Sequence, residues 1–290
     1  MIFGAHCSTA GGLHQALERG KRIGAEVVQL FVKNNMQWSS KGLSAADRAR
    51  FQETRERLGI RAVFGHTGYL INLGAPASAN RDRSIASLIE EITLATALEL
   101  PFLVLHPGAH LGAGEPAGLR QVAAGLDEVL AATRRSRVRV ALENTAGQGT
   151  CLGASVRHLA TIYDGVQCPE RLGLCLDTAH FFAAGYDLRT RPGWETAMRE
   201  VETLVGLDQV LAFHLNDSKT GLASRVDRHA GIGEGCLGRE AFRQVVNDPR
   251  LAGRPGCLET PKSEDLHEDI ANLAVLRSLV RRVRTPRPRR

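Results

Sequence analysis

The sequence predicts a TIM (β/α)8 barrel, an α/β fold in which parallel strands alternate with helices eight times. The chain has 290 residues, an ordinary length for one such barrel. Short apolar runs alternate with stretches of helical spacing, and no linker or low-complexity segment interrupts them before the C-terminal tail. No G-x-G-x-x-G motif follows the first apolar run, which argues against an open dinucleotide-binding sheet.

The predicted strands are short apolar runs, and glycines and prolines cluster in the loops that follow them. In chain order, the strands cover residues 2–5, 27–31, 61–64, 102–105, 138–142, 172–176, 210–213 and 256–258. A helix is predicted after each strand, where apolar residues recur every three or four positions. In chain order, the helices cover residues 13–17, 45–58, 83–98, 119–132, 155–163, 194–205, 239–246 and 265–280. Within 83–98, one side of the helix carries Ile85, Leu88, Ile89, Ile92 and Leu98.

Composition excludes several classes of protein. Hydrophobic residues make up 43% of the chain, enough for a sizeable core. The N-terminus lacks a charged lead and a long apolar stretch, so no signal peptide is expected. No apolar run approaches the roughly 20 residues of a membrane helix. The six cysteines form no C-x-x-C pair, which predicts reduced, mostly packing residues. We therefore expect a cytoplasmic monomer with no membrane partner.

The positive charge of the chain is concentrated at its C-terminus. The net charge is +6, and the last ten residues contain six arginines and no acid, so the rest of the chain is neutral overall. We predict a single barrel domain in residues 1–280 and a disordered basic tail in residues 281–290. Such a tail can bind a polyanion through salt-sensitive attraction, or it can be solvated without a dedicated role.

Histidines and carboxylates follow the predicted strands from the third strand onward. They are His66, His106, Glu143, Asp177, His180, His214, Asp227, His229 and Glu259. A parallel barrel gathers the carboxyl ends of its strands on one face, so these side chains should converge on one pocket. Imidazole with carboxylate is a ligand set for zinc or manganese. Five histidines and four carboxylates are too many for one tetrahedral ion and suit two or three.

The spacing of two pairs supports a metal centre. Asp227 and His229 are two residues apart on one side of an extended loop, and Asp177 and His180 lie within one turn of each other. Two or more ions bridged by a carboxylate such as Glu143 suit the hydrolysis of phosphate esters. The other histidines are weaker candidates. His6 and His110 could support the ligands, whereas helix surfaces are expected to carry His14, His158 and His267.

Some loops could also contact a polyanion. Residues 31–38 contain Lys33, three amides and Trp38, and residues 69–72 follow His66. Residues 216–219 and 225–229 add cations beside the expected ligands. Apolar side chains next to amides are typical of proteins that enter a minor groove, although composition alone favours ordinary loop packing.

Several sequence blocks resemble one family, the barrel-type apurinic/apyrimidinic endonucleases known as the endonuclease IV family. The block at 142–149 reads LENTAGQG, and the block at 175–180 reads CLDTAH. Further matching blocks lie at residues 4–12, 66–73, 105–108, 214–219, 227–235 and 258–262. The resemblance runs from Gly4 to Lys262 and implies a TIM barrel.

The resemblance implies a centre of about three zinc ions, with manganese possible in part. The first ion would be held by His66, His106 and Glu143. The second would be held by Glu143, Asp177, His214 and Glu259. The third would be held by His180, Asp227 and His229. Glu143 is then the expected catalytic residue that bridges two ions and positions the attacking hydroxide, and Glu259 is the second expected catalytic residue.

The implied activity is DNA repair at the nucleoid. The family cuts the phosphodiester 5′ to an abasic site in double-stranded DNA, leaves a 3′-hydroxyl and a 5′-deoxyribose phosphate, and trims blocked 3′ ends. Tyr69 and Leu70 match the segment that the family inserts into DNA. Further candidates for DNA contact are Asn34, Gln37, Lys219 and Arg228. This sequence departs from the family at three positions. Met36 stands where some members have an arginine, Ala179 where the family usually has a cysteine, and Ala223 where it usually has a glycine.

Two other functions remain open on sequence grounds. A barrel sugar isomerase or epimerase would use a similar fold and similar carboxylates, but only one or two ions, so it would not need the group of His180, Asp227 and His229. A catalytically silent DNA-binding barrel would have no reason to retain the complete ligand set. Metal content distinguishes the first alternative from a nuclease.

Overall fold

The computed structural model describes residues 1–281, so the predicted basic tail lies outside the described residues apart from Arg281. Within this range, eight parallel strands close into a barrel in the order β1-β10-β7-β6-β5-β4-β3-β2. The barrel strands are β1 (Ile2–His6), β2 (Val27–Phe31), β3 (Ala62–His66), β4 (Phe102–Leu105), β5 (Arg139–Glu143), β6 (Leu172–Asp177), β7 (Val210–His214) and β10 (Pro255–Leu258). β1 pairs with both β2 and β10, which closes the ring. The predicted TIM barrel is confirmed.

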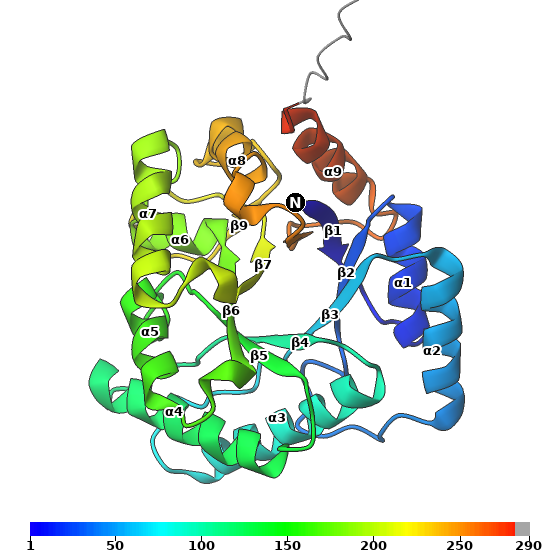
Figure 1. Cartoon of the computed structure of the whole chain (residues 1–290), viewed down its shortest axis with the longest axis vertical. Helices are drawn as coiled ribbons and strands as arrows, with labels where there is room; N and C mark the ends of the chain where they lie inside the picture. The colour runs from blue at the N-terminus through cyan, green and yellow to red at the C-terminus, as the bar shows by residue number, and fades with distance from the viewer. Residues whose placement is uncertain (282–290) are drawn as a thin grey trace, which may run out of the picture.

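Helices surround the barrel on its outer side, as Figure 1 shows. They are α1 (Leu13–Arg22), α2 (Ala45–Leu58), α3 (Ala79–Ala97), α4 (Glu115–Ala132), α5 (Val156–Gly165), α6 (Thr178–Ala184), α7 (Arg191–Leu204), α8 (Gly238–Val246) and α9 (His267–Leu279). Single-turn 3-10 helices at Pro169–Arg171, Leu207–Gln209 and Pro249–Leu251 precede β6, β7 and β10. Side-chain oxygens of Ser44, Ser78, Ser155 and Thr190 accept backbone N–H groups at the starts of α2, α3, α5 and α7.

Besides the 3-10 helices, one helix and one hairpin were not predicted from the sequence. The short helix α6 follows β6 directly, and it is almost wholly buried, so it shows no amphipathic spacing. The antiparallel hairpin of β8 (Asp217–Ser218) and β9 (His229–Ala230) lies in the loop after β7. Helix α1 also extends to Arg22, beyond the predicted end at residue 17. The prediction ended early because the last turn is basic, which suits the end of a helix but breaks the apolar pattern.

Apolar side chains fill the inside of the barrel below its carboxyl-end face. The inner cluster includes Val27, Phe64, Phe102 and Val104, and the rings of Phe64 and Phe102 stack with centroids 4.6 Å apart. A second cluster packs the helices against the outer faces of the strands. The barrel is therefore a packed core, and a polar site can form only at its ends.

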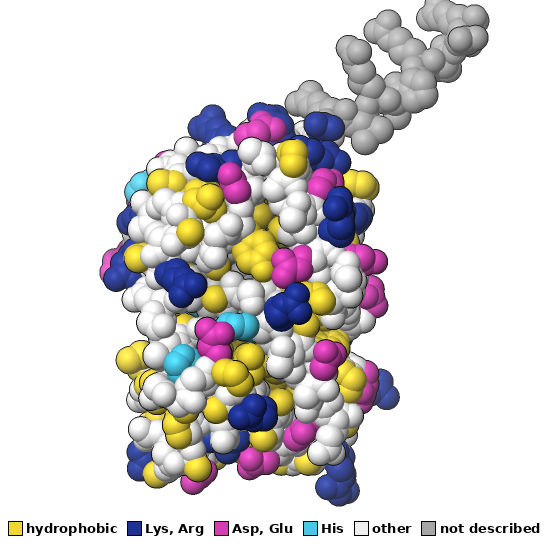
Figure 2. Space-filling view, turned by 90° about the vertical axis from the view of Figure 1, so that its left-hand side faces the viewer, with side chains coloured by type: hydrophobic (Ala, Val, Ile, Leu, Met, Phe, Trp, Pro, Cys, Tyr) yellow, Lys and Arg dark blue, Asp and Glu magenta, His cyan; other side chains and the backbone are white. Residues whose placement is uncertain are grey.

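All six cysteines are free thiols, but only Cys7, Cys175 and Cys257 are buried. The expectation of mostly packing residues therefore fits half of them. Among the described residues, no helix has the length and apolar character needed to cross a membrane. On the flank seen in Figure 2, basic, acidic and apolar side chains are interspersed, so the described part of this flank has no single basic patch for nucleic acid.

Candidate metal centre

The barrel brings all nine predicted ligands together on one face. Four of them end strands: His66 ends β3, Glu143 ends β5, Asp177 ends β6 and His214 ends β7. Two come directly after strands, namely His106 after β4 and Glu259 after β10. The remaining three are His180 in α6, His229 in β9 and Asp227 just before β9. Eight of them supply ligand atoms to overlapping groups in which every atom lies within 4.8 Å of the others, and Asp227 adjoins the last of these groups.

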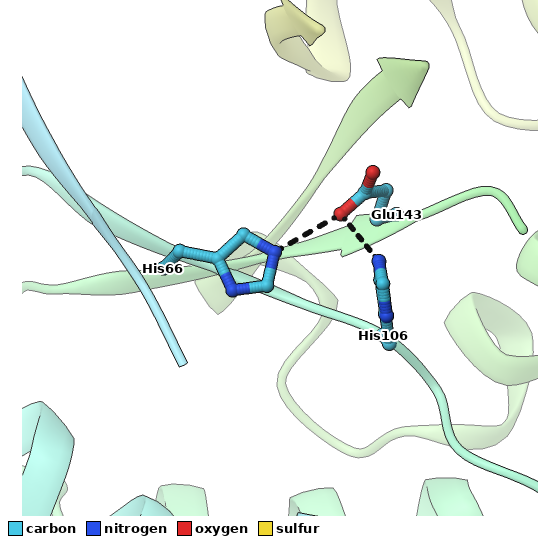
Figure 3. Close-up of side chains that lie close together, drawn as sticks. All are labelled: His66, His106 and Glu143. Carbon is cyan, nitrogen blue, oxygen red and sulfur yellow. Dashed lines mark hydrogen bonds and ion pairs between the residues drawn. The ribbon is translucent and has the colours of Figure 1, made fainter. Parts of the chain in front are cut away.

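The first group consists of His66, His106 and Glu143. Figure 3 shows the two imidazoles pointing at the same carboxylate oxygen from different strand ends. The distances from Glu143 Oε2 are 3.2 Å to His66 Nε2 and 2.9 Å to His106 Nε2. Glu143 is completely buried. Two ring nitrogens and one oxygen thus converge from three sides, as ligands of one ion do.

The second group consists of Glu143, Asp177, His214 and Glu259. His214 Nδ1 lies 2.8 Å from Glu143 Oε1, 3.2 Å from Glu259 Oε2 and 3.9 Å from Asp177 Oδ2. Glu143 therefore uses one oxygen in the first group and the other in the second. This geometry fits a carboxylate that bridges two ions.

The third group contains Asp177, His180 and His229, with Asp227 close to both histidines. Asp227 Oδ2 lies 3.2 Å from His180 Nε2, and Asp227 Oδ1 lies 3.3 Å from His229 Nε2. The family resemblance assigned Asp177 to the second group only, whereas the structure places this carboxylate in both. The three groups form one continuous cluster in which carboxylates link neighbouring imidazoles.

Hydrogen bonds fix which ring nitrogen of three histidines faces the cluster. His66, His180 and His229 turn Nδ1 toward a backbone carbonyl at 2.8, 2.8 and 3.2 Å. The acceptors are the carbonyls of Thr67, Asn144 and Glu259. Because a carbonyl only accepts, Nδ1 must carry a proton, so Nε2 is the nitrogen left to bind an ion once its own proton is displaced. Oriented imidazoles of this kind are typical of metal ligands.

One atom of the third group lacks any partner in hydrogen bonding. His229 Nε2 is buried and has no hydrogen-bond partner among residues 1–281, although it faces the carboxylates of Asp177 and Asp227. A buried imidazole nitrogen without a partner is costly unless another group binds it. A metal ion between these three side chains would satisfy it, so the residues present fit an ion at this position.

The electrostatics of the cluster also match a metal centre. Burial alone would raise the pKa of Glu143, but His214 and His106 hold this pKa well below its usual value. Burial alone would lower the pKa of His180 and His229, but Asp177 and neighbouring carboxylates raise both, that of His229 to about 9. Without ions, protonated imidazoles offset the charge of the carboxylates, and bound ions would replace those imidazole protons.

Residues next to the ligands hold them in place, and no clear signal in the sequence pointed to them. Asn216 donates from Nδ2 to Asp177 Oδ2 at 2.6 Å and accepts the N–H of Glu259 at 2.7 Å. The buried Asp217 accepts four backbone N–H groups of the loop that carries β9. Their positions just after His214 are the one available hint. The hydrogen bonds of Asn216 and Asp217 shape the loop so that His229 reaches the cluster.

The candidate DNA-contacting residues surround the centre but do not form one group. Asn34 and Tyr69 line a cavity of about 680 Å³ that also touches His229 and Glu259. The residues outside its lining are Gln37, Leu70, Lys219 and Arg228. Leu70 is half-buried and the other three are exposed. Tyr69 is 61% exposed, so its ring is free to contact a ligand at the cavity mouth.

The loop cation Lys33 is not available to a polyanion, as the ordinary loop packing favoured by composition would have it. Its side chain is 2% exposed and donates to Trp38 O at 2.7 Å, Ser87 Oγ at 2.7 Å and Glu90 Oε2 at 3.0 Å. It also lies 3.6 Å from Glu91 Oε1. Lys33 therefore fixes the loop after β2 to helix α3.

Glu91 extends the same network to the loop after β3. Its carboxylate accepts the N–H of Gly68 at 3.1 Å, and the next residue, Tyr69, donates its N–H to Asn35 O at 3.1 Å. A side chain at Gly68 would approach Asn35 O and Glu91 Oε1 to 3.1 and 3.3 Å, so the loops pack closely here. Both candidate DNA-contacting loops thus share one buried anchor.

The remaining histidines divide as follows. His6 lines the cavity and lies beside Glu259, as a supporting residue would. His110 lines a different cavity, together with His158. His158 was expected on a helix surface, but it is largely buried and bonds Glu115 at 3.0 Å, because α4 packs against α5 at this point. His267 is exposed at the start of α9, and His14 lies on α1.

Fold and site together define a class of protein, a TIM barrel with a candidate multi-ion centre at the carboxyl ends of its strands. Residues 17–279 match the family described as Xylose isomerase-like TIM barrel. The "Probable endonuclease 4" of Chloroflexus aurantiacus is 50% identical over 278 residues, which cover 96% of this chain and 98% of that protein. The "Probable endonuclease 4" of Geobacter sulfurreducens is 46% identical and covers 96% and 94%, respectively.

Solved structures give the same result. Endonuclease IV from Thermus thermophilus has a TM-score of 0.84 and 34% identity, covering 96% of this chain and 98% of that one. The chain belongs to the endonuclease IV family. A D-tagatose 3-epimerase-like protein has a TM-score of 0.73 at 17% identity, with 96% of this chain and 97% of that one covered. This second likeness shows the fold alone.

Proposed function

We propose that this chain is a zinc-dependent apurinic/apyrimidinic endonuclease. It hydrolyses the phosphodiester 5′ to an abasic site in double-stranded DNA, leaves a 3′-hydroxyl and a 5′-deoxyribose phosphate, and trims blocked 3′ ends. The observation that carries the proposal is the convergence of nine imidazole and carboxylate side chains, the buried Glu143 among them. Membership of the endonuclease IV family supports the same activity.

The ligand set favours about three zinc ions, with manganese possible in part. The first ion would be held by His66, His106 and Glu143. The second would be held by Glu143, Asp177, His214 and Glu259. The third would be held by His180, His229 and Asp227, with Asp177 within reach. When bound, such ions polarise the phosphate and supply a nucleophile from water at neutral pH.

The residues of the chain orient the ligands and shape the site. Glu143 and Glu259 keep their pKa values below the usual range, so both carboxylates are charged and available at neutral pH. The hydrogen bonds behind His66, His180 and His229 hold their rings in one orientation. The reaction therefore needs little rearrangement of the protein when the substrate binds.

The cavity beside the centre suits a displaced nucleotide. Its volume of about 680 Å³ lies in the usual range for small-molecule sites. An abasic nucleotide has no base to unstack, so turning it out of the duplex costs less than turning out an intact one. Burial raises the pKa of the Tyr69 hydroxyl to about 12, so it remains a neutral donor at the cavity mouth.

The outer contacts to DNA are assigned to residues on the loops around this cavity. Lys219 and Arg228 are exposed on the hairpin side and can neutralise phosphates. Asn34, Gln37, Tyr69 and Leu70 belong to the two loops that share the Lys33 and Glu91 anchor. They would contact sugars and bases where the duplex opens. A monomeric state and a cytoplasmic, nucleoid-associated location remain predictions.

The test uses a duplex that carries one abasic analogue. The zinc-loaded protein is expected to cut just 5′ to the analogue, and a strong chelator should abolish the cut. Replacing Glu143 by Gln should lower the rate by more than about 100-fold, because a lost ligand costs more than the roughly 10–100-fold of a lost outer partner. Glu115→Gln is the matched control, because Glu115 bonds His158 outside the centre.

Two results would contradict the proposal. One is cleavage that persists after complete removal of metal. The other is the absence of cleavage together with metal-dependent epimerisation of a ketose sugar, which would favour the alternative of a sugar isomerase or epimerase. A metal content of one or two manganese ions per chain would point the same way.

A further inference from the structure

Gln29 contacts three side chains at the edge of the candidate metal centre, although its strand, β2, supplies no ligand. It is completely buried. Gln29 Oε1 lies 2.7 Å from His214 Nε2, and Gln29 Nε2 lies 2.5 Å from Glu259 Oε1 and 2.8 Å from His6 Nδ1. Each end of this amide therefore contacts a member of the second group.

The partners of Gln29 determine the direction of its amide. The carboxylate of Glu259 can only accept a hydrogen bond, so the NH₂ group of Gln29 must face it. The carbonyl oxygen of Gln29 then faces His214, whose Nε2 must be the donor. Reversing the amide would put two oxygens 2.5 Å apart at Glu259, which is unfavourable because both are acceptors.

This direction has a consequence for His214. Because Nε2 carries a proton and donates it to Gln29, Nδ1 is the nitrogen that can give a lone pair to an ion. His214 Nδ1 is the atom that faces Glu143 Oε1 at 2.8 Å and Glu259 Oε2 at 3.2 Å. Among the five histidines of the centre, His66, His180 and His229 are set by backbone carbonyls. The ring of His214 is instead oriented by the side chain of Gln29. It presents Nδ1 to the centre, whereas those three histidines present Nε2.

The amide of Gln29 also orients the side chains of Glu259 and His6. Gln29 occupies Glu259 Oε1 and leaves Oε2 pointing toward His214. His6 Nδ1 is closer to Gln29 Nε2, at 2.8 Å, than to Glu259 Oε1, at 3.4 Å. It therefore accepts from the amide, and its own proton lies on Nε2. That nitrogen is buried without a hydrogen-bond partner in the described part of the chain, and it belongs to a residue that lines the cavity.

We propose that Gln29 is a positioning residue of the second ion group. It fixes the ring-nitrogen assignment of His214 and the orientation of Glu259, and it does not contact the ion itself. This inference rests on the proposed metal centre but not on the proposed substrate. If Gln29 only filled space, an apolar side chain of the same length would replace it without consequence.

The test compares metal affinity among three variants. Gln29→Met keeps the length of the side chain but loses both hydrogen-bonding ends. Gln29→Glu keeps an acceptor for His214 but sets a second carboxylate against Glu259. Gln209→Met is the matched control, because Gln209 bonds Arg139 and Tyr163 at the amino-terminal side of β7, away from the centre. Zinc affinity is measured by competition with a chelating dye of known affinity.

Both Gln29 variants are expected to bind one zinc ion about 10–100-fold more weakly, as loss of an outer partner does, while Gln209→Met binds like the parent protein. A second readout is the ¹⁵N spectrum of ring-labelled His214 without metal, in which Gln29→Met should lose the protected Nε2–H signal. Melting in the presence of chelator checks that each variant folds. If Gln29→Met fails to fold, Gln29→Glu alone decides.

Zinc affinity of the deciding Gln29 variant within about threefold of the parent protein, which corresponds to less than about 1 kcal/mol, would overturn the inference. Failure of the broader proposal looks different. If the parent protein itself binds no zinc, the metal centre is wrong, whatever Gln29 does. If the parent protein binds zinc and Gln29→Met binds it equally well, only the role of Gln29 is wrong.

Discussion

Replacing Lys33 by Met should destabilise the protein strongly, although Lys33 is not a ligand. The Lys33 side chain is 2% exposed, and its ammonium group is the cation beside Glu91, whose side chain is 0% exposed. Removing one partner of a buried ion pair leaves the other charge uncompensated and costs about 3–5 kcal/mol. The carbonyl of Trp38 and the hydroxyl of Ser87 also lose their donor. At roughly 2–4 °C per kcal/mol for a large domain, the melting temperature should fall by roughly 6–20 °C.

The assay is thermal unfolding followed by circular dichroism at one fixed zinc concentration. Arg61→Met is the control, because Arg61 pairs with Glu26 at 2.6 Å but the side chains are 59% and 37% exposed. Such a surface pair contributes at most about 1 kcal/mol. The double variant Lys33→Met/Glu91→Gln should recover most of the loss, since the introduced amide keeps an acceptor for the N–H of Gly68 and removes the stranded charge.

The effect of Lys33→Met should also depend on pH. Burial raises the pKa of Glu91 from 4.5, its value in the unfolded chain, to about 7. Glu91 therefore favours the folded state below pH 4.5, and this contribution is lost as the pH rises through about 7. The loss caused by Lys33→Met should be smaller near about pH 5.5 than near about pH 8. The reasoning would be refuted if Lys33→Met lowered the melting temperature no more than Arg61→Met does at both pH values.

Four single features give further predictions. First, the pKa of His229 is raised to about 9 and those of His66, His180 and His214 are also raised. The stability that these groups contribute is present below the unfolded pKa of 6.5 and is lost as the pH rises through about 9. The metal-free protein should therefore have a lower melting temperature at pH 9 than at pH 6.5. A higher melting temperature at the alkaline pH would contradict this. Second, Met36→Arg adds a cation to a side chain that is 64% exposed, and it should steepen the salt dependence of DNA binding by about 0.9 in log–log slope, measured by fluorescence anisotropy; an unchanged slope would place Met36 outside the interface. Third, Ala223 has φ 60°, the left-handed region, so Ala223→Gly should stabilise the protein by about 0.5–1 kcal/mol in urea unfolding; a destabilised variant would show that the methyl group makes a needed contact. Fourth, deleting residues 281–290 removes six arginines and should flatten the salt dependence of DNA binding, whereas an unchanged slope would show that the tail does not contact DNA.

Local patterns predicted most of the fold. Apolar runs of strand length and helical spacing identified every barrel strand, and each outer helix was found to within a few residues except the end of α1 and the starts of α3 and α4. The misses have a common cause. Helix α6 is buried on nearly all sides, and the hairpin of β8 and β9 is held by the carboxylate of Asp217 and not by its own apolar pattern. Neither leaves a periodic signal in the sequence.

The candidate ligands could be predicted because their type and their place at strand ends are both visible in the sequence. Residues that orient them could not. Gln29 is one polar residue in an apolar strand, and the sequence does not tell whether its amide faces water, the helices or the metal centre. Ordinary packing was favoured for the loop that contains Lys33, but the sequence could not name its partners, because Glu90 and Glu91 are more than fifty residues away in the chain.

The sequence by itself determined the barrel and the face on which the imidazoles and carboxylates meet. This is because strand and helix periods are local properties, and a parallel barrel sends all its strand ends to one side. The tertiary structure decided which oxygen of Glu143 meets which histidine, which ring nitrogen is free, and which charges are buried. Those features depend on ångström-scale distances between residues that are remote in the chain, and hydrogen bonds and burial set these distances only after the barrel has closed.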